Sequence, residues 1–404
     1  MVPETARALG VALLRELGGP VAVIRDTRES GQAVLSALLE GLGGEGIDYG
    51  VLPTPALSQL LASGAGAAGI AITASHNPWQ DNGLKVLGPE GGKLSLAEEA
   101  SLEASLVACG SEPGAQGTPR HGDGNEIYRQ AILERLPEGD WLSGVRLVLD
   151  AAHGAAWASA PAILERLGAD LHLLGCAPDG RNINQQCGAM HPEQLAETVR
   201  STGAQAGIAL DGDGDRCVMV DRQGQIVDGD ALLLLLAQPP GLVGTAMCNG
   251  ALPRALDAQG IAFTAVDVGD RNVAMEMQNR GWLVGGEPSG HVLLKEGLPT
   301  GDGLFTALKA LAGGLDLAER LVEWRPMPQC HLSLPVREKP PLESYPSLHE
   351  LARRAEEAEV SRVLLRYSGT EPRLRILVEA ESRDHAQVWM DRLAAEVARV
   401  GLLA

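Results

Sequence analysis

The feature that most constrains the fold is a recurring pattern: a short apolar run ends in polar residues and precedes a stretch of helical periodicity. The first run, VAVIRDT at 21–27, is followed by apolar residues at helical spacing from Val34 to Leu42. Comparable runs begin at positions 69, 145 and 206. Short strands that alternate with helices are typical of α/β domains with parallel sheets.

The end of the chain has a different character. The 404 residues predict two to four domains, at roughly 100–200 residues per domain. The proline-rich segment 337–347, REKPPLESYPS, is predicted to be a linker. Two strand-like segments, SRVLLRYS and RLRILVEA, follow it, and a helical tail begins near Asp384. The sequence therefore predicts a smaller C-terminal α+β domain from about Pro340.

The charge balance limits the partners of this chain. A formal net charge of −19 argues against nucleic acid or an acidic membrane, since both need a basic face. The longest aliphatic run, ALLLLLAQ from Ala231, is too short to span a bilayer, and residues 1–19 predict an amphipathic helix rather than a signal peptide. Six cysteines without a CxxC pair favour free thiols in a cytoplasmic protein.

The segment LDGDGDRC at 210–217 predicts a metal site. Its three aspartates, Asp211, Asp213 and Asp215, alternate with glycines that allow a tight turn. Three hard oxygen ligands suit Mg²⁺, and the carboxylates would repel one another without a cation. An EF-hand is excluded because Arg216 and Arg222 occupy its glycine and glutamate positions. A solvated Asp–Gly turn is the alternative.

The segment AITASHNPWQDNGLKV at 71–86 is interpreted as a phosphorylation site at Ser75. Like Asp150 and Asp211, Ser75 follows a predicted strand, where open α/β sheets bind ligands. Pro78 predicts the first turn of a helix capped by Asn77, which would place Ser75 near a helix N-terminus that favours an anion. No GxSxG elbow supports a hydrolase, and a simple capping serine is the alternative.

Two further segments offer ligands for a phosphorylated sugar. GGEPSGH at 285–291 could bind sugar hydroxyls, although a polar surface turn is an equal alternative. RYSGTEPRLR at 366–375 is predicted to form a phosphate cradle, with a hairpin carrying surface arginines as its alternative. The residues concerned are Glu287, Ser289 and His291 in the first segment and Arg366, Ser368, Gly369, Thr370 and Arg375 in the second.

The order of these motifs, TASHNP, DGDGDR, GEPSGH and RYSGTEP, resembles the α-D-phosphohexomutase family over nearly the whole chain. ASHNPWQDNGLK, INQQCGA and VGDRNV are similar to its branch that acts on glucosamine phosphates. The resemblance implies three similar α/β domains with mixed or parallel sheets and a smaller C-terminal α+β domain around a central cleft. The expected domains are 1–135, 136–240, 241–336 and 337–404.

The resemblance also implies the residue roles. Ser75 would carry the phosphoryl group, and its phosphate with the three aspartates would hold one Mg²⁺ per subunit. Lys85 and His291 would serve as acid, base or phosphate contact, and Arg216 would line the cleft as a catalytic residue. The expected substrate-binding residues are Arg271, Glu287, Ser289, Arg366, Ser368, Gly369, Thr370 and Arg375.

The reaction implied is the isomerisation of glucosamine 6-phosphate and glucosamine 1-phosphate through a phosphoserine enzyme and glucosamine 1,6-bisphosphate, which supplies cell-wall precursors. The partner would be a small phosphosugar, bound by a cytoplasmic monomer or homodimer. The family's opening segment of the FGTDGIRG type is absent from a sequence that begins MVPETARALG. We therefore expect either that the start of the sequence is misplaced or that the chain lacks an active-site arginine and an edge of its first domain.

Three alternatives remain at this point. A phosphoglucomutase or phosphomannomutase with the same mechanism is favoured by Pro288, where the glucosamine branch usually has glutamine, and by the threonine of TASHNP. A catalytically impaired phosphosugar-binding protein would explain the absent opening segment. A metal-dependent phosphatase would need neither the sugar loop nor the phosphate cradle.

Overall fold

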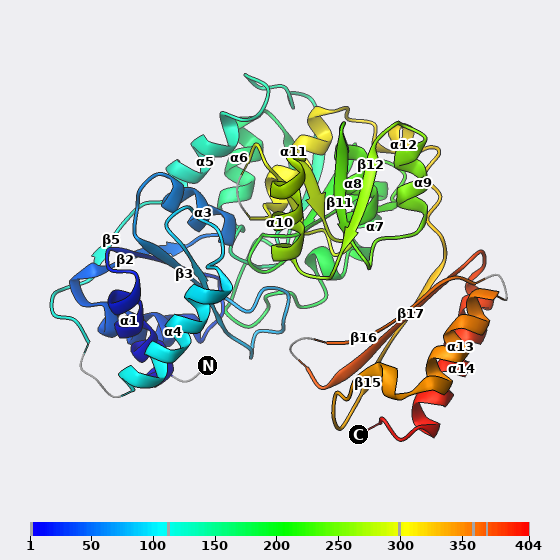
Figure 1. The fold of residues 1–404 in the computed structure, drawn as a ribbon. Coiled ribbons are helices and arrows are strands. Elements are labelled where there is room, and N and C mark those ends of the chain that lie inside the picture. The colour runs from blue at the N-terminus through cyan, green and yellow to red at the C-terminus, as the bar shows by residue number, and fades with distance from the viewer. Residues whose placement is uncertain (1–2, 111–113, 298–299, 358–359, 369–370, 404) are drawn as a thin grey trace. The chain divides into compact units, whose positions relative to one another are not determined.

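The chain forms two units, each built from helices and sheets (Figure 1). The computed structural model describes residues 3–110, 114–297, 300–357, 360–368 and 371–403. The first unit comprises Met1–Cys248 and Gln259–Glu323, and the second Asn249–Ala258 and Trp324–Ala404.

The first sheet has the strand order β4-β3-β1-β2-β5, and only the β3–β4 pair is antiparallel. In its centre, Val21 of β1 pairs with Gly46 of β2 and Ala68 of β3. Apolar side chains from α1, α2 and α4 pack with these strands into one core. The elements are α1 (Pro3–Glu16), β1 (Val21–Arg25), α2 (Gly31–Leu42), η1 (Gly43–Glu45), β2 (Gly46–Val51), α3 (Thr54–Ala62), β3 (Ala68–Ile72), β4 (Leu84–Leu87), α4 (Leu96–Cys109), β5 (Arg120–His121) and α5 (Asn125–Leu133).

The second sheet repeats this plan in the order β10-β9-β8-β6-β7. Leu147 of the parallel core strand β6 pairs with Leu171 of β7 and Ala206 of β8, and β9 returns antiparallel to β8. The elements are β6 (Arg146–Asp150), α6 (Ser159–Arg166), β7 (Asp170–Leu174), η2 (Gly188–Met190), α7 (Glu193–Thr202), β8 (Ala206–Leu210), β9 (Cys217–Asp221) and β10 (Ile226–Val227).

The two sheets share a packing device in β3 and β8, whose sequences AGIAI and AGIAL are buried throughout. A Cβ on Gly69 of β3 would lie 2.7 Å from Leu61 of α3, and one on Gly207 of β8 would lie 2.8 Å from Leu195 of α7. Glycine at these positions therefore lets each helix lie directly against its strand.

The third sheet, in the order β12-β11-β13-β14, completes the three sheets described in the first unit. β11 is parallel to β12 and β13, and β14 is antiparallel to β13. The elements are α8 (Gly229–Leu236), β11 (Gly241–Thr245), α9 (Ala251–Asp257, grouped with the second unit), β12 (Ala262–Val266), α10 (Asp270–Arg280), β13 (Val284–Gly286), β14 (Val292–Leu294), α11 (Gly303–Ala312) and α12 (Leu317–Arg320).

The second unit contains an antiparallel sheet in the order β15-β17-β16, with α13 and α14 together on one face (Figure 1). Strand β15 pairs with β17, so the predicted domain start at 337 falls between this strand and the rest of the unit. The proline-rich segment 337–347 connects two elements of the same unit. The elements are β15 (Gln329–Pro335), η3 (Leu342–Ser344), α13 (Pro346–Glu357), β16 (Val360–Tyr367), β17 (Arg373–Ala380) and α14 (Arg383–Arg399).

The predicted fold class is confirmed: three α/β sheets of mixed direction precede a smaller α+β unit. The predicted N-terminal helix, the two C-terminal strands and the helical tail are all present, and the six cysteines are free. Among the described residues, no helix has the length and apolar character needed to cross a membrane. Polar loops follow β3, β8 and β13, and these loops contain most of the predicted site residues of the first unit, whereas Lys85 lies in β4 and Arg271 in α10.

Candidate active site

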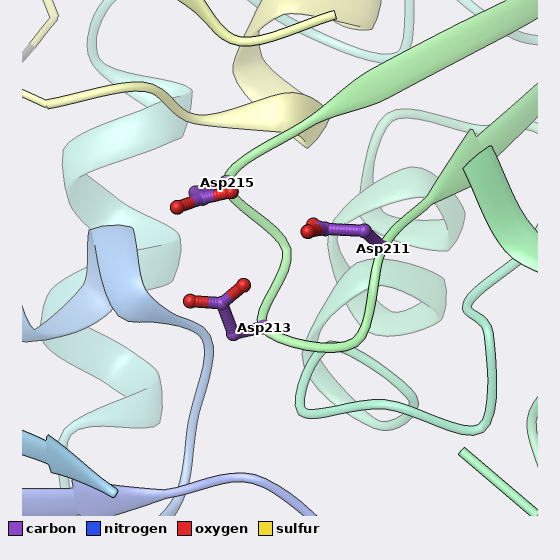
Figure 2. Close-up of side chains that lie close together, drawn as sticks. All are labelled: Asp211, Asp213 and Asp215. Atoms are coloured by element: carbon purple, nitrogen blue, oxygen red, sulfur yellow. The ribbon is translucent and has the colours of Figure 1, made fainter. Parts of the chain in front are cut away.

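The loop between β8 and β9 brings three buried carboxylates together. Asp211, Asp213 and Asp215 each offer an oxygen that lies within 4.8 Å of the others, and Figure 2 shows the side chains around one common space. Gly214 makes the turn possible with a left-handed φ of 73°. The structure thus produces the cluster that the DGDGD spacing predicts.

The electrostatics of this cluster favour a cation. Burial and repulsion from Asp215 and Asp213 raise the pKa of Asp211 to about 8. Burial alone would raise the pKa of Asp215 too, but Lys85 and His291 hold it well below its usual range. Ionising all three carboxylates at these distances costs free energy, because the negative charges repel one another, unless positive charge lies among them.

The oxygens that remain available suit a hard divalent ion. Within the described part of the chain, Asp213 Oδ1 and Asp215 Oδ1 are buried and make no hydrogen bond. Asp213 Oδ2 instead accepts from Thr54 Oγ1 at 2.5 Å and Lys85 Nζ at 2.6 Å. Buried carboxylate oxygens without donors need an explanation, and oxygen coordination of Mg²⁺ provides one.

Ser75 reaches this cluster from the loop after β3. Its Oγ donates to Asp211 Oδ2 at 2.8 Å and lies 3.5 Å from His76 Nδ1. The helix predicted to begin at Pro78 is wrong: residues 74–83 form turns, and Ser75 itself has a φ of 50°. Ser75 Oγ therefore faces the carboxylate cluster without the help of a helix N-terminus.

Two cationic side chains border the carboxylates. Lys85 of β4 contacts Asp213 at 2.6 Å and Asp215 at 2.8 Å. Burial would lower the pKa of Lys85, but these two carboxylates raise it above its usual value. Arg216 Nε lies 3.9 Å from Asp215 Oδ1. Both cations offset part of the negative charge of the cluster, and each acts to lower the pKa of Asp211.

His291 is buried between two carboxylates, with Nδ1 3.6 Å from Asp215 Oδ1 and Nε2 3.6 Å from Asp270 Oδ2. Burial would lower the pKa of His291, but Asp215 and then Asp270 raise it overall. The two carboxylates thus stabilise the protonated form of His291. This contact joins the loop after β13 to the aspartate loop.

The predicted sugar ligands lie on the loop after β13. Glu287 Oε1 accepts from Gly269 N at 2.9 Å, and Ser289 Oγ donates to Glu287 Oε2 at 3.3 Å. Arg271 bonds instead to the Leu94 carbonyl and to the Glu99 carboxylate. The structure thus groups Glu287 with Ser289. Arg271 instead contacts α4 and the residues just before that helix.

The predicted phosphate cradle lies in the second unit. Arg366 and Arg375 are paired across β16 and β17, which concentrates positive charge. Buried Ser368 accepts from Glu371 N through its Oγ, and its carbonyl accepts from Lys339 Nζ at 2.6 Å. Gly369 and Thr370 lie outside the described residues.

Three residues absent from the sequence predictions support the site. Thr54 bonds to Asp213 through both its hydroxyl and its backbone N–H. Arg28 and Asn184 both bond to the Ser75 carbonyl. Partners of Thr54 and Asn184 lie more than 100 positions away in the chain, so only the folded structure shows the contacts.

Comparison with known proteins was made on both sequence and structure. The chain matches phosphoglucomutase/phosphomannomutase alpha/beta/alpha domain I at 1–109, domain II at 126–224, domain III at 228–322 and the C-terminal domain at 350–398. It is 42% identical to a phosphoglucosamine mutase of Bordetella petrii over 97% of this chain and 93% of that protein. It is 39% identical to one of Myxococcus xanthus over 98% and 92%.

Solved structures share the fold. A phosphoglucomutase/phosphomannomutase family protein from Burkholderia thailandensis superposes with a TM-score of 0.80 at 27% identity, covering 100% of this chain and 95% of its own. N-acetylphosphoglucosamine mutase of Aspergillus fumigatus, solved with GlcNAc-6P and magnesium, gives 0.64 at 18% identity, covering 86% and 92%. At that identity the second likeness concerns the fold alone.

Proposed function

This chain belongs to the phosphoglucomutase/phosphomannomutase family, and we propose that it interconverts glucosamine 6-phosphate and glucosamine 1-phosphate, the reaction of phosphoglucosamine mutases. The observation that carries the proposal is the contact of Ser75 Oγ with Asp211 Oδ2 at 2.8 Å, beside carboxylate oxygens that make no hydrogen bond within the described residues. The phosphoglucosamine mutases that match nearly the whole of this chain support glucosamine as the sugar.

Asp211, Asp213, Asp215 and the phosphorylated Ser75 would hold Mg²⁺. Mg²⁺ would supply positive charge to the phosphoryl oxygens when bound. Lys85 adds positive charge from the protein, since its pKa is raised by Asp213 and Asp215, and the neighbouring carboxylates also raise the pKa of His291. We propose Lys85, Arg216 and His291 as catalytic residues on this basis.

The phosphoryl group moves in two balanced steps. In the first, the bond between Ser75 Oγ and phosphorus breaks while a sugar hydroxyl forms a new bond to phosphorus, giving glucosamine 1,6-bisphosphate. The hydroxyl loses a proton and Ser75 Oγ gains one. In the second, the other phosphoryl group of the reoriented bisphosphate returns to Ser75. Fixed donors and cations around the transferring group are the main source of rate in such reactions.

Further residues are proposed to bind the substrate. Glu287 and Ser289 present oxygens for sugar hydroxyls, and Arg271 is retained as a proposed substrate contact. Arg366, Ser368, Gly369, Thr370 and Arg375 are proposed to bind the phosphate that does not react, because paired arginines and hydroxyls suit such a group. The free cysteines support the cytoplasmic location that we propose.

The test is a mutase assay with Mg²⁺ and a trace of sugar bisphosphate, comparing glucosamine, glucose and mannose 6-phosphates. We expect the wild-type chain to prefer glucosamine 6-phosphate and Ser75→Ala to show no turnover. Ser36→Ala is the control. Ser36 is exposed on α2, and in the part of the chain that the structure describes its hydroxyl bonds only to the Gln32 carbonyl of the same helix. Full activity of Ser75→Ala, or preference for glucose or mannose phosphate, would contradict the proposal.

A further inference from the structure

The backbone of the loop that carries Ser75 is held by a buried arginine. Arg28 Nη2 donates to the carbonyls of Ser75 at 2.9 Å and Asn77 at 2.8 Å. Arg28 Nη1 donates to the carbonyl of Asp81 at 2.9 Å and to that of Pro78. One guanidinium therefore contacts four carbonyl oxygens within seven residues of chain. The planar fork of arginine suits this geometry, which a lysine ammonium could not reproduce.

A second donor, from the loop between β7 and η2, reaches two of the same carbonyls. Asn184 Nδ2 donates to Ser75 O at 2.9 Å and to Asn77 O at 3.1 Å. Asn184 adopts a left-handed φ of 59°, and its own N–H bonds to Ala152 O at 2.9 Å. The side chain is thus presented to the Ser75 loop by a segment whose backbone is itself held in place.

The arginine is anchored at its other end. Arg28 Nε donates to Asp26 Oδ2 at 2.8 Å, and both side chains are fully buried. Thr73 Oγ1 donates to the same Asp26 oxygen at 2.7 Å and accepts from Ser75 N at 3.0 Å. The Ser75 N–H is therefore connected to Asp26 through Thr73, and the Ser75 carbonyl bonds directly to Arg28.

This double attachment accounts for the conformation of Ser75. A left-handed φ on a residue with a side chain is unfavourable and persists where surrounding contacts impose it. The contacts to Arg28, Asn184 and Thr73 impose it here, and they leave Oγ free to face Asp211.

We propose that Arg28 and Asn184 are positioning residues that hold the peptide groups of Ser75 and Asn77, so that Ser75 Oγ stays aimed at Asp211. Neither residue needs to touch the substrate for this role. The catalytic consequence rests on the proposed mutase function, whereas the effect on the loop does not. Misplacement of a reacting oxygen by about 1 Å can cost on the order of 100-fold in rate.

The main test is Asn184→Ala. It removes one of the two side chains that donate to the Ser75 and Asn77 carbonyls, a pair of contacts that we call the clamp, and it leaves the buried Asp26–Arg28 ion pair intact. We expect kcat to fall about 10- to 100-fold while KM for the sugar phosphate changes less than about twofold. Asn182→Ala is the matched control, because among the described residues the Asn182 side-chain amide bonds only to Ala177 and Asp179 in the same loop. A kcat for Asn184→Ala within twofold of the control, or a loss confined to KM, would overturn the proposal.

Arg28→Lys is the second variant. Lysine keeps the charge next to Asp26 but cannot reach four carbonyls at once, so we expect a larger fall in kcat than for Asn184→Ala. Because the two side chains share the carbonyls of Ser75 and Asn77, the double variant should lose less than the product of the single losses. Independent, multiplicative losses would contradict a shared clamp.

Hydrogen exchange separates this inference from the mutase function. We expect the amides of 73–83 to exchange faster in Asn184→Ala than in Asn182→Ala, without any substrate present. Equal exchange would overturn the clamp even in an active enzyme. If the wild-type chain lacked mutase activity while exchange changed as expected, the proposed function would fail and the clamp would stand.

Discussion

The Ser75 loop and the aspartate loop follow equivalent buried strands, β3 and β8, but different interactions determine their shapes. The aspartate loop turns through its own glycines, and Gly214 takes the left-handed conformation. The segment from Ala74 to Asn82 contains no glycine, and Ser75 itself takes that conformation. Its shape depends on Arg28 and Asn184, which lie 47 and 109 positions away. The turn of the aspartate loop follows from its own glycines, with Thr54 as an added support, whereas the path of the Ser75 loop depends on distant side chains.

Apart from the loss of Ser75 itself, the largest effect should come from Asp213→Asn, which keeps the loop shape but removes one charge from the locally specified cluster. We expect kcat to fall about 100- to 1,000-fold, because a cation at the cluster would lose a charged ligand. In thermal unfolding, the stabilisation of the wild-type chain by Mg²⁺ should largely disappear in the variant.

The control for Asp213→Asn is Asp221→Asn. Asp221 is also buried and stands at the end of β9, but it accepts from the backbone of Gln223 and Gln225 and lies outside the cluster. It should keep both activity and the Mg²⁺ effect. An unchanged Mg²⁺ stabilisation of Asp213→Asn would show that this carboxylate is not a ligand.

The same contrast explains what the sequence could predict. The buried strands, the helices between them and the convergence of Asp211, Asp213 and Asp215 follow from residues close together in the chain, and the structure confirms them. The helix predicted at Pro78 was a local inference too, and it failed because the carbonyls of that segment bond to Arg28 instead of to helical N–H groups. No local pattern marks Arg28, Asn184 or Thr54 as partners of the site.

The aspartate loop nevertheless has one distant support that titrates. Gly303 N donates to Gly214 O at 3.0 Å, and the adjacent Asp302 caps α11 through Phe305 N. Tyr128 also donates to Asp302, at 3.1 Å. Burial raises the pKa of Asp302 to about 6. Ionisation of this buried carboxyl group next to Gly303 therefore destabilises the folded state.

Asp302→Asn tests that support through pH. Below about pH 3 the aspartate is protonated in both states, whereas above pH 6 the folded chain holds a buried charge that the unfolded chain exposes to water. The wild-type free energy of unfolding should therefore fall by about 3 kcal/mol between pH 3 and 7 from this group, and the variant should lack this fall.

Urea unfolding at each pH, without Mg²⁺, measures the difference. Asp316→Asn is the control, because Asp316 caps α12 as an exposed group whose bonds to the Glu319 backbone and then to Arg222 lower its pKa. That control should keep the wild-type decline. Parallel pH profiles of wild type and Asp302→Asn would refute a buried charge at this position.

The smallest effect expected is that of Gly214→Ala, and it tests the comparison most directly. Alanine in the left-handed conformation costs roughly 1 kcal/mol. At Gly214 the new Cβ would also lie 2.9 Å from Pro53 Cβ, so we expect the free energy of unfolding to fall by about 2 kcal/mol in total and Mg²⁺ binding to weaken.

Gly203→Ala is the matched control: its φ is 65°, and a Cβ there would meet no atom within 4 Å among the described residues. Urea unfolding of both variants separates the two contributions, because Gly203→Ala should lose only the conformational part and keep its Mg²⁺ affinity. Equal losses with unchanged Mg²⁺ affinity would mean that the aspartate loop relaxes around the new side chain, and that local sequence specifies it no more tightly than it specifies the loop of Ser75.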